Sequence, residues 1–463
     1  MSLSVLEALS ILEPLDPTRR RFQGLLASQS QSYSSASDDE DKGLHKWLDA
    51  LASLLKSLSG SPPKQVCALS MSLVNTSCTV TVAFNAKNED PENVSNVMHS
   101  IWNWMKEASV LPSAEMPKKN EELLIIILKA SLDKIRRRLQ EKGWFVNSVI
   151  ETGGNSGVLT HAQKKLLLVI ASLQHELLRF LGSDAETLDF SIAAQMLCFR
   201  AEEYKKPVAK PGMKWPSLIR HVEKLLKPYN QFQLIGKFAR RSFMRGAVAS
   251  IPLFVNILPS PGTPSQSVLR PIEDYETRVR AYLQSVLESY SPNDASSPHA
   301  EDTIAKFWQR IKEVVQPSPL VPAHCECTLL RHHLDLHIHN VAAPPYPYFG
   351  VSKPLCFQCV LYFAAYKACE LGPSFGTRLP NFFRSMKACA ALPVCDRGND
   401  EADRAIERQM SIQLEKIFGE LLQNRVAEQR ELKRETHPLP IVEDFLEAVR
   451  AETLARHPYL RPS

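Results

Sequence analysis

The sequence predicts a mixed α and β fold (α+β, rich in helix), in which a small α/β/α domain is embedded in a mainly helical protein. Three observations lead to this prediction. Residues 79–84 alternate between polar and apolar side chains after a turn at residues 75–77, which is typical of a β-hairpin. Residues 92–290 carry apolar side chains at helical spacing. Residues 346–351 form a short apolar run that a turn connects to a Cys-x-x-Cys pair, as in a strand followed by a helix.

The N-terminal region, residues 1–60, is expected to hold helices joined by a disordered linker at residues 28–42. The linker is rich in Ser, Gln and acidic residues, a composition that cannot bury enough apolar surface to fold. Residues 45–58 then place apolar side chains on one face of an amphipathic helix.

The hairpin, residues 64–86, differs in pattern from the sequence around it, and a hairpin must bury its apolar face on another element. The helical region of residues 92–290 follows it. Residues 401–463 are expected to form C-terminal helices, one long and highly charged at 401–435 and a short one at 439–455.

Composition sets broad limits on function. The chain has 463 residues, enough for two or three domains, with 44% hydrophobic and 23% charged residues, which is typical of a soluble globular protein. The net charge of +5 permits contact with nucleic acid without requiring it. The N-terminus lacks the basic start of a secretory signal, and the apolar runs at 123–128 and 166–171 are too short to span a membrane. Ten cysteines in such a chain indicate a reducing compartment, so we expect a cytoplasmic or nuclear protein without membrane contact.

Two short motifs carry the chemistry: His324-Cys325-Glu326, and Cys356-Phe357-Gln358-Cys359. In the first turn of a helix, Cys356 and Cys359 would place both sulfurs on one side, where free backbone N–H groups favour thiolates. His324 falls near the start of another helix and would supply a nitrogen ligand. This set suits a catalytic zinc ion (Zn2+), which keeps its fourth position open. Glu326 cannot easily share the metal, but it can reach a water bound there.

This order of motifs resembles the cytidine deaminase-like superfamily, whose signature is His-x-Glu followed by Pro-Cys-x-x-Cys. The stretch from Phe349 to Cys359, with Ser352-Lys353 before the cysteines, looks most like a toxin-related branch of nucleic acid deaminases that is common in fungi. One position departs from the superfamily signature: Leu355 precedes the first cysteine, and the proline is displaced to Pro354. That departure makes the chain less similar to free-nucleoside deaminases.

The resemblance implies a deaminase-like zinc domain at residues 300–400. It implies that His324, Cys356 and Cys359 bind zinc and that Glu326 is the general acid and base. The reaction would be hydrolytic deamination of a nucleobase, cytosine or adenine, in a nucleic acid or nucleotide. A deaminase sheet needs two antiparallel strands before its first zinc helix. We therefore expect the hairpin at 64–86 to supply them, with residues 92–290 as an insertion; a separate N-terminal α/β element is the alternative.

Other interpretations remain open. Cys325 and Cys327 could join Cys356 and Cys359 in a closed structural zinc site, which would make the protein a non-catalytic, zinc-stabilised helical scaffold. Residues two apart on a helix point in nearly opposite directions, which counts against that set. The cysteines could also be core residues without metal, or the chain could bind nucleic acid without any chemistry. The sequence does not identify protein partners.

Four histidines follow the first motif: His332, His333, His337 and His339. No cluster of carboxylates or thiols accompanies them, so a second metal site is not favoured. We interpret them as surface residues of a helix end and the following loop.

Overall fold

The computed structural model describes Ala8, Leu12 and residues 39–58, 65–74, 76–85, 90–155, 160–181, 189–208, 216–241, 251–259, 273–314, 324–339, 344–379 and 400–434. The chain divides into two compact units. The unit that holds the two motifs, called the site unit below, comprises Thr18–Leu269 and Pro317–Met410. The second, called the helical unit, comprises Met1–Pro17, Arg270–Gln316 and Ser411–Ser463.

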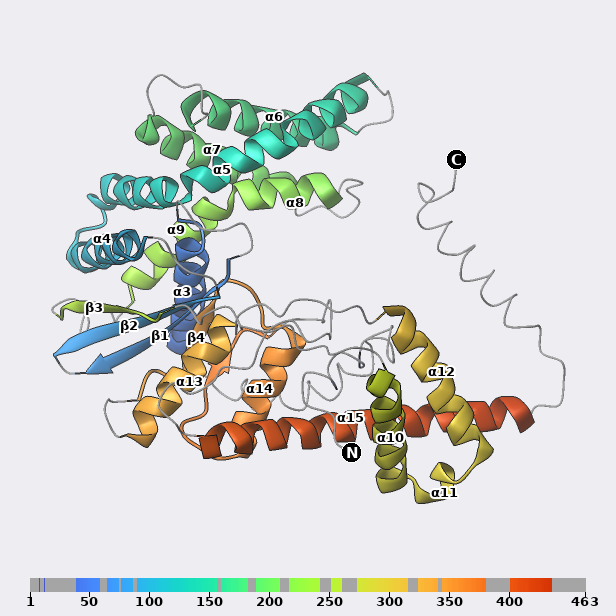
Figure 1. The fold of residues 1–463 in the computed structure, drawn as a ribbon. Helices are drawn as coiled ribbons and strands as arrows, with labels where there is room; N and C mark the ends of the chain where they lie inside the picture. The colour runs from blue at the N-terminus through green and yellow to red at the C-terminus, as the bar shows by residue number, and fades with distance from the viewer. Residues whose placement is uncertain are drawn as a thin grey trace. The chain divides into compact units, whose positions relative to one another are not determined.

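The described part of the chain is mainly helical, with one small mixed sheet, as the sequence predicts (Figure 1). The helices are α3 (Asp39–Leu55), α4 (Pro91–Val110), α5 (Met116–Asn155), α6 (His161–Leu181), α7 (Phe190–Val208), α8 (Pro216–Leu225), α9 (Lys227–Ala239), α10 (Glu273–Tyr290), α11 (Pro292–Ala295), α12 (Pro298–Val314), α13 (Cys325–Ile338), α14 (Phe357–Ala368) and α15 (Asp400–Arg434). The strands are β1 (Cys67–Val74), β2 (Ser77–Phe84), β3 (Leu253–Ile257), β4 (Tyr348–Val351) and β5 (Gly376–Thr377).

The sheet brings distant parts of the site unit together in the strand order β3-β2-β1-β4-β5. β1 and β2 form the antiparallel hairpin, in which Cys67 pairs with Phe84. β1 also pairs with β4, with Leu69 opposite Gly350, again antiparallel. β3 and β5 add parallel strands at the two edges. The hairpin and the strand that leads to Cys-x-x-Cys are therefore neighbours in one sheet.

The two faces of the sheet are covered by different helices. Paired residues share a face, so Leu69 and Gly350 lie on one side, and there Gly350 approaches the backbone of Leu48 in α3. Ser70, one residue along β1, points to the other side and contacts α13. Phe349 of β4 lies on that side too, against Phe363 of α14. The result is an α/β/α arrangement in which α13 and α14 lie opposite α3 (Figure 1).

A continuous apolar core joins α3 and the hairpin to helices α4–α9. The alternating strand pattern and the helical periodicity of the sequence both point their apolar residues into this core. Trp47 of α3 stacks on Phe238 of α9 with ring centroids 4.8 Å apart. Because α3 also packs on β4, the helical region and the sheet bury a shared surface.

The helical unit contains α10, α11, α12 and the part of α15 from Ser411 onward. Tyr282 of α10 packs edge-on against Phe418 of α15 at 5.5 Å. Gly419 is required beside Tyr290, because a Cβ atom there would lie 2.4 Å from the tyrosine ring. The periodic apolar residues of the long charged helix are buried, as its pattern predicts: Ile406, Met410, Leu414, Ile417, Phe418 and Leu421.

The structure corrects two boundaries. The region of residues 92–290 is not wholly helical, because β3 lies within it and pairs with β2. The expected linker of residues 28–42 ends earlier, because α3 begins at Asp39. Residues 28–38 and the short helix expected at 439–455 lie outside the described residues.

Among the described residues, no helix combines the length and the apolar character that crossing a bilayer would require.

Candidate metal and proton-transfer site

Two helix N-termini meet at the site. His324 is the N-cap of α13, and Cys356 is the N-cap of α14; both have extended backbone angles there. Cys359 lies in the first turn of α14, and its backbone N–H donates to the Cys356 sulfur over 3.4 Å. The sulfur of Cys356 is therefore held in place by the helix that this residue caps. The free N–H groups and positive dipole ends of both helices face the same place, which favours anionic ligands.

The three predicted metal ligands converge. The Nδ1 atom of His324 lies 3.1 Å from the Cys359 sulfur and 3.4 Å from the Cys356 sulfur. The two sulfurs are 3.4 Å apart, and all ligand atoms of the set lie within 4.8 Å of one another. In the described part of the chain, this is the set of His, Cys, Asp and Glu side chains that gathers closely enough to hold a metal ion.

These donors fit zinc. Bonds of about 2.3 Å to sulfur and about 2.0 Å to nitrogen place tetrahedral zinc ligands about 3.5–3.8 Å apart. The observed separations of 3.1 Å and 3.4 Å are within a few tenths of an ångström of those values. Two sulfurs and one imidazole nitrogen leave a fourth position for water or substrate.

Glu326 lies in the first turn of α13, two residues after His324, and its side chain is 96% buried, with 4% exposed. Burial raises the pKa of Glu326, and the neighbouring His324 opposes that rise. For His324, burial lowers the pKa, but the hydrogen bond and charge of Cys356, with the charge of Glu326, outweigh it and leave the pKa raised. The carboxyl group and the three donors thus form one electrostatically connected site.

Cys325 and Cys327 take other positions. The Cys325 thiol is fully buried and lies 3.5 Å from the Glu326 carboxylate, away from the sulfur pair. The Cys327 thiol contacts Cys359, yet it does not belong to the converging donor set. Burial raises the pKa of both thiols. The four-cysteine set considered from the sequence is therefore not assembled, because residues two apart on α13 point in different directions.

Buried polar contacts hold α13 in place. The Ser70 hydroxyl of β1 lies 2.6 Å from Nε2 of His333. Arg331, two residues before His333, is also buried and lies 3.0 Å from Asp403 of α15 and 3.3 Å from Asp335. α13 is therefore tied to the sheet and to the start of α15.

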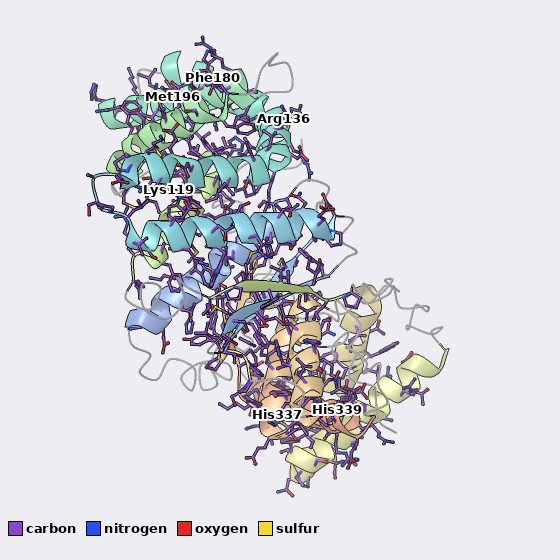
Figure 2. The ribbon with its side chains drawn as sticks, turned by 90° about the vertical axis from the view of Figure 1, so that its left-hand side faces the viewer. Lys119, Arg136, Phe180, Met196, His337 and His339 are labelled. Atoms are coloured by element: carbon purple, nitrogen blue, oxygen red, sulfur yellow. The ribbon has the colours of Figure 1, made fainter. Side chains whose placement is uncertain are left out.

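The surface interpretation of the four histidines is wrong for His333, which is buried with 5% exposure among Phe349 and Phe375. Burial lowers its pKa to about 3. His337 and His339 are exposed at the end of α13, as predicted (Figure 2). Because α13 continues through this segment, successive side chains point by turns into the core and toward the surface.

The aromatic residues near the motifs are core residues. Phe349 and Phe357 have 0% and 2% exposure, which excludes an exposed stacking surface at either ring. Tyr348 stacks on His45 with ring centroids 3.8 Å apart, and its hydroxyl donates to Asp49 over 3.2 Å. Asp49 is a residue that sequence reasoning missed.

Asp49 of α3 also accepts a hydrogen bond from the backbone N–H of Val351 over 2.8 Å and pairs with Arg378 at 3.7 Å. Burial raises the pKa of this carboxyl group, and Arg378 opposes the shift. It therefore holds β4 at the point where the chain turns toward Cys356. An isolated acid in an amphipathic helix gives no sequence signal of such a role.

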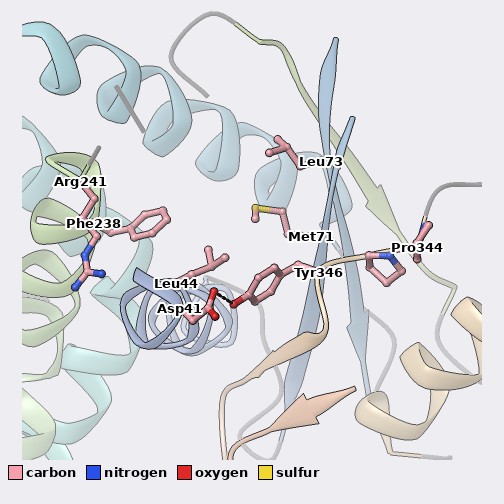
Figure 3. Close-up of a pocket in the computed structure, with 9 residues that line it drawn as sticks. Asp41, Leu44, Met71, Leu73, Phe238, Arg241, Pro344 and Tyr346 are labelled. Carbon is pink, nitrogen blue, oxygen red and sulfur yellow. Dashed lines mark hydrogen bonds between the residues drawn. The ribbon is translucent and has the colours of Figure 1, made fainter. Parts of the chain in front are cut away.

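A cavity of about 270 Å³ lies elsewhere in the site unit, between α3, β1 and the segment before β4 (Figure 3). Its lining includes Leu44, Met71 and Phe238, and the hydroxyl of Tyr346 donates to Asp41 over 2.5 Å at its edge. Met71 shares the α3 face of the sheet with Leu69. The cavity is thus on the opposite face from α13, and none of the three converging donors lines it.

Comparison with known proteins agrees with the geometry. No curated protein and no solved structure matches the chain. Residues 323–384 match the family described as OTT_1508_deam-like deaminase. The matched segment contains His324, Glu326, Cys356 and Cys359. This part of the chain, with its His/Cys/Cys donor set, is therefore deaminase-like.

Proposed function

We propose that the protein is a zinc-dependent hydrolytic deaminase of a nucleobase, with His324, Cys356 and Cys359 as metal ligands and Glu326 as general acid and base. The observation that carries the proposal is the position of Glu326. Its buried carboxyl group interacts electrostatically with His324 and Cys356, two members of a three-donor set that would leave one coordination position of zinc open. The match of residues 323–384 to a deaminase-like family supports the same assignment.

The site residues have separate tasks. When bound, zinc would act as a Lewis acid that lowers the pKa of a water molecule. Glu326 would accept a proton from the attacking water, whose oxygen bonds to the ring carbon that carries the amino group. Glu326 would pass this proton to the ring nitrogen, then take the second proton from the hydroxyl now bonded to the carbon and give it to the leaving amine. The carbon–nitrogen bond breaks, ammonia departs, and the base keeps the oxygen of water, so atoms and charge balance.

The finer assignment is also a proposal. The substrate would be cytosine or adenine in a nucleotide or a nucleic acid. The Ser-Lys-x-x-Cys-x-x-Cys form, with Ser352 and Lys353, favours the toxin-related branch common in fungi. The described cysteines are free thiols, which fits a cytoplasmic or nuclear protein. Imaging of a tagged chain would test that location, and secretion into the medium would contradict it.

The direct test is Glu326→Gln in the zinc-loaded, full-length protein. Wild-type protein should release ammonia from cytosine- or adenine-containing substrates and incorporate oxygen from labelled water into the base. The variant should keep its zinc and lose turnover by at least about a hundredfold, the lower range for a positioned acid–base group. Equal turnover in wild type and variant would contradict the assignment of Glu326.

A second candidate function is a structural zinc site in a helical scaffold. The observation that favours it is the contact between the Cys327 thiol and Cys359, which brings a third sulfur near the donor set. In that case Cys327→Ser would remove zinc as completely as Cys356→Ser. A catalytic site with His324 as ligand predicts that Cys327→Ser retains stoichiometric zinc.

A further inference from the structure

Six basic side chains of the site unit interact with one another, and one of them, Lys353, also interacts with His324 of the candidate metal site. They come from five parts of the chain: the end of α3, the middle of α5, the start of α9, the turn after β4, and the residue after β5. We call them the basic cluster: Lys56, Lys134, Arg138, Lys227, Lys353 and Arg378.

Hydrogen bonds bring α3 and α5 together at this cluster. The ammonium group of Lys134 donates to the Ser57 hydroxyl over 3.0 Å, one residue after Lys56. The side chain of Lys56 in turn contacts that of Lys353. Contact between two cations costs free energy through charge repulsion, unless an anion bridges them.

The start of α9 completes the cluster. The guanidinium of Arg138 donates to the backbone carbonyl of Lys224, one turn before Lys227. Lys227 is the first residue of α9, and the N-cap, Leu226, offers no side-chain cap. A helix N-terminus carries positive partial charge, so a lysine there is disfavoured unless an anion lies nearby.

Four lysines of the cluster stand outside the ion pairs of the described residues. In the described part of the chain, no carboxylate forms an ion pair with Lys56, Lys134, Lys227 or Lys353. Arg378 does pair with Asp49, but that carboxylate also accepts the Val351 N–H. Among the described side chains, the positive charge of these four lysines is therefore not balanced by ion pairing.

The electrostatic consequence is large. Burial and then repulsion from the other cations lower the pKa of Lys134 to about 6 and that of Lys56 to about 7. The same two causes lower the pKa of Lys227 to about 8. Holding these groups together without an anion costs stability, because each ammonium is harder to charge in the folded protein than in the unfolded chain.

The cluster reaches the candidate metal site through Lys353. This residue is exposed and lies three positions before Cys356, and its charge acts on His324. A ligand that holds its base at His324 and Glu326 could thus present an anionic group to Lys353. Lys56 and Lys227, which are half-buried, would interact with the same anionic group.

We propose that the basic cluster is the place where the protein binds a phosphate group of the substrate. This inference rests on the proposed function and deepens it, because it names the side chains that would hold the phosphate. Several ammonium and guanidinium groups around one phosphate form charge-assisted hydrogen bonds, the stronger class of hydrogen bond in proteins. The phosphate could belong to a free nucleotide or to a nucleic acid backbone.

Calorimetric titration of the zinc-loaded, full-length protein tests the proposal. The ligands are inorganic phosphate, cytidine and adenosine monophosphates, the two nucleosides, and a short single-stranded oligonucleotide. The double variant Lys353→Gln/Lys227→Gln removes one exposed and one half-buried cation and relieves repulsion, so it should fold. Lys237→Gln is the matched control, because Lys237 is exposed on the same helix α9 and stands outside the basic cluster.

We expect phosphate-bearing ligands to bind wild type and the control alike. The double variant should bind them at least about tenfold more weakly, which corresponds to the loss of one charge-assisted hydrogen bond. The affinity for nucleosides should be the same in the double variant as in wild type. Tighter binding of monophosphates would identify a nucleotide substrate. Tighter binding of the oligonucleotide, with steep salt dependence, would identify a nucleic acid backbone. Equal affinities in wild type and double variant would overturn the proposal.

The failure of this proposal can be told apart from that of the proposed function. If wild type and double variant deaminate nucleosides and nucleotides equally well, the phosphate site is rejected and the assignment as a deaminase stands. Phosphate binding that depends on Lys353 and Lys227, in a protein without deaminase turnover, would keep the anion site and reject the enzyme.

Discussion

Ser70 in β1 and His333 in α13 form a 2.6 Å hydrogen bond between residues 263 positions apart in the chain. The bond joins the hairpin to the helix that begins at His324 and carries Glu326. Both partners are buried, with 1% and 5% exposure. The helix that carries Glu326 is thus tied to a strand near the start of the chain.

Replacing Ser70 by Ala should destabilise the protein by about 1–3 kcal/mol, because it leaves a buried imidazole nitrogen without its partner. Chemical denaturation measures the change. Ser72→Ala is the matched control, since Ser72 lies two residues along the same face of β1 and is only partly buried. A loss of stability that is the same in both variants would contradict a specific role for the Ser70–His333 bond.

His333 should make the protein sensitive to acid. Its folded-state pKa is about 3, against an ordinary value of 6.5, because burial disfavours the charged ring. Between these values the unfolded chain binds a proton that the folded protein does not, so stability falls as the pH falls from 6.5 toward 3. The slope from this one group approaches about 1.4 kcal/mol per pH unit.

Denaturation at a series of pH values tests this prediction. His333→Gln can keep a hydrogen bond to Ser70 without titrating, so it should flatten the loss of stability below pH 6.5. His337→Gln, on the exposed end of the same helix, is the control substitution. Parallel profiles for wild type and His333→Gln would show that His333 is not the sensitive group.

Gly350 should tolerate no side chain. A Cβ atom there would lie 2.5 Å from the backbone carbon of Leu48, so Gly350→Ala must push α3 away from β4. We expect a large destabilisation and a lower melting temperature. Gly236→Ala is the contrasting substitution, because the nearest atom would be 4.0 Å away on Trp104. In the helix α9 it should be neutral or stabilising by up to about 1 kcal/mol. Equal melting temperatures for the two variants would contradict the close packing of α3 on β4.

Removing the metal should lower the melting temperature. Zinc would tie the start of α13 to the start of α14, and the free energy of binding then contributes to folding. Cys356→Ser should contain little zinc and should not respond further to a chelator. Cys369→Ser, at the C-terminal end of the same helix, should behave as wild type. If the melting temperature of the wild type is the same with and without chelator, metal does not stabilise the protein.

Local patterns predicted much of the fold. The alternating residues of the hairpin form β1 and β2, and the apolar positions of 401–435 are buried in α15. The convergence of His324 with Cys356 and Cys359 also follows from local signals, because each motif sits at a helix start that its own neighbours define.

Other features depend on long-range contacts that no local pattern records. β3 forms because its five residues pair with β2, although the prolines on either side, Pro252 and Pro259, could have indicated a short strand. His333 faces the core because α13 continues through it, and its partner there, Ser70, comes from a strand far away in the sequence. Asp49 and the basic cluster draw on segments of the chain that are far apart in sequence, so neither forms a motif.

X-ray absorption at the zinc edge, on metal-quantified protein, distinguishes a catalytic zinc site from a structural one. We expect one zinc per chain with two sulfur ligands, one imidazole nitrogen and one oxygen, because His324, Cys356 and Cys359 converge and would leave the fourth position open. Four sulfur ligands would bring Cys325 and Cys327 into the site, close it to water, and contradict a catalytic role for Glu326.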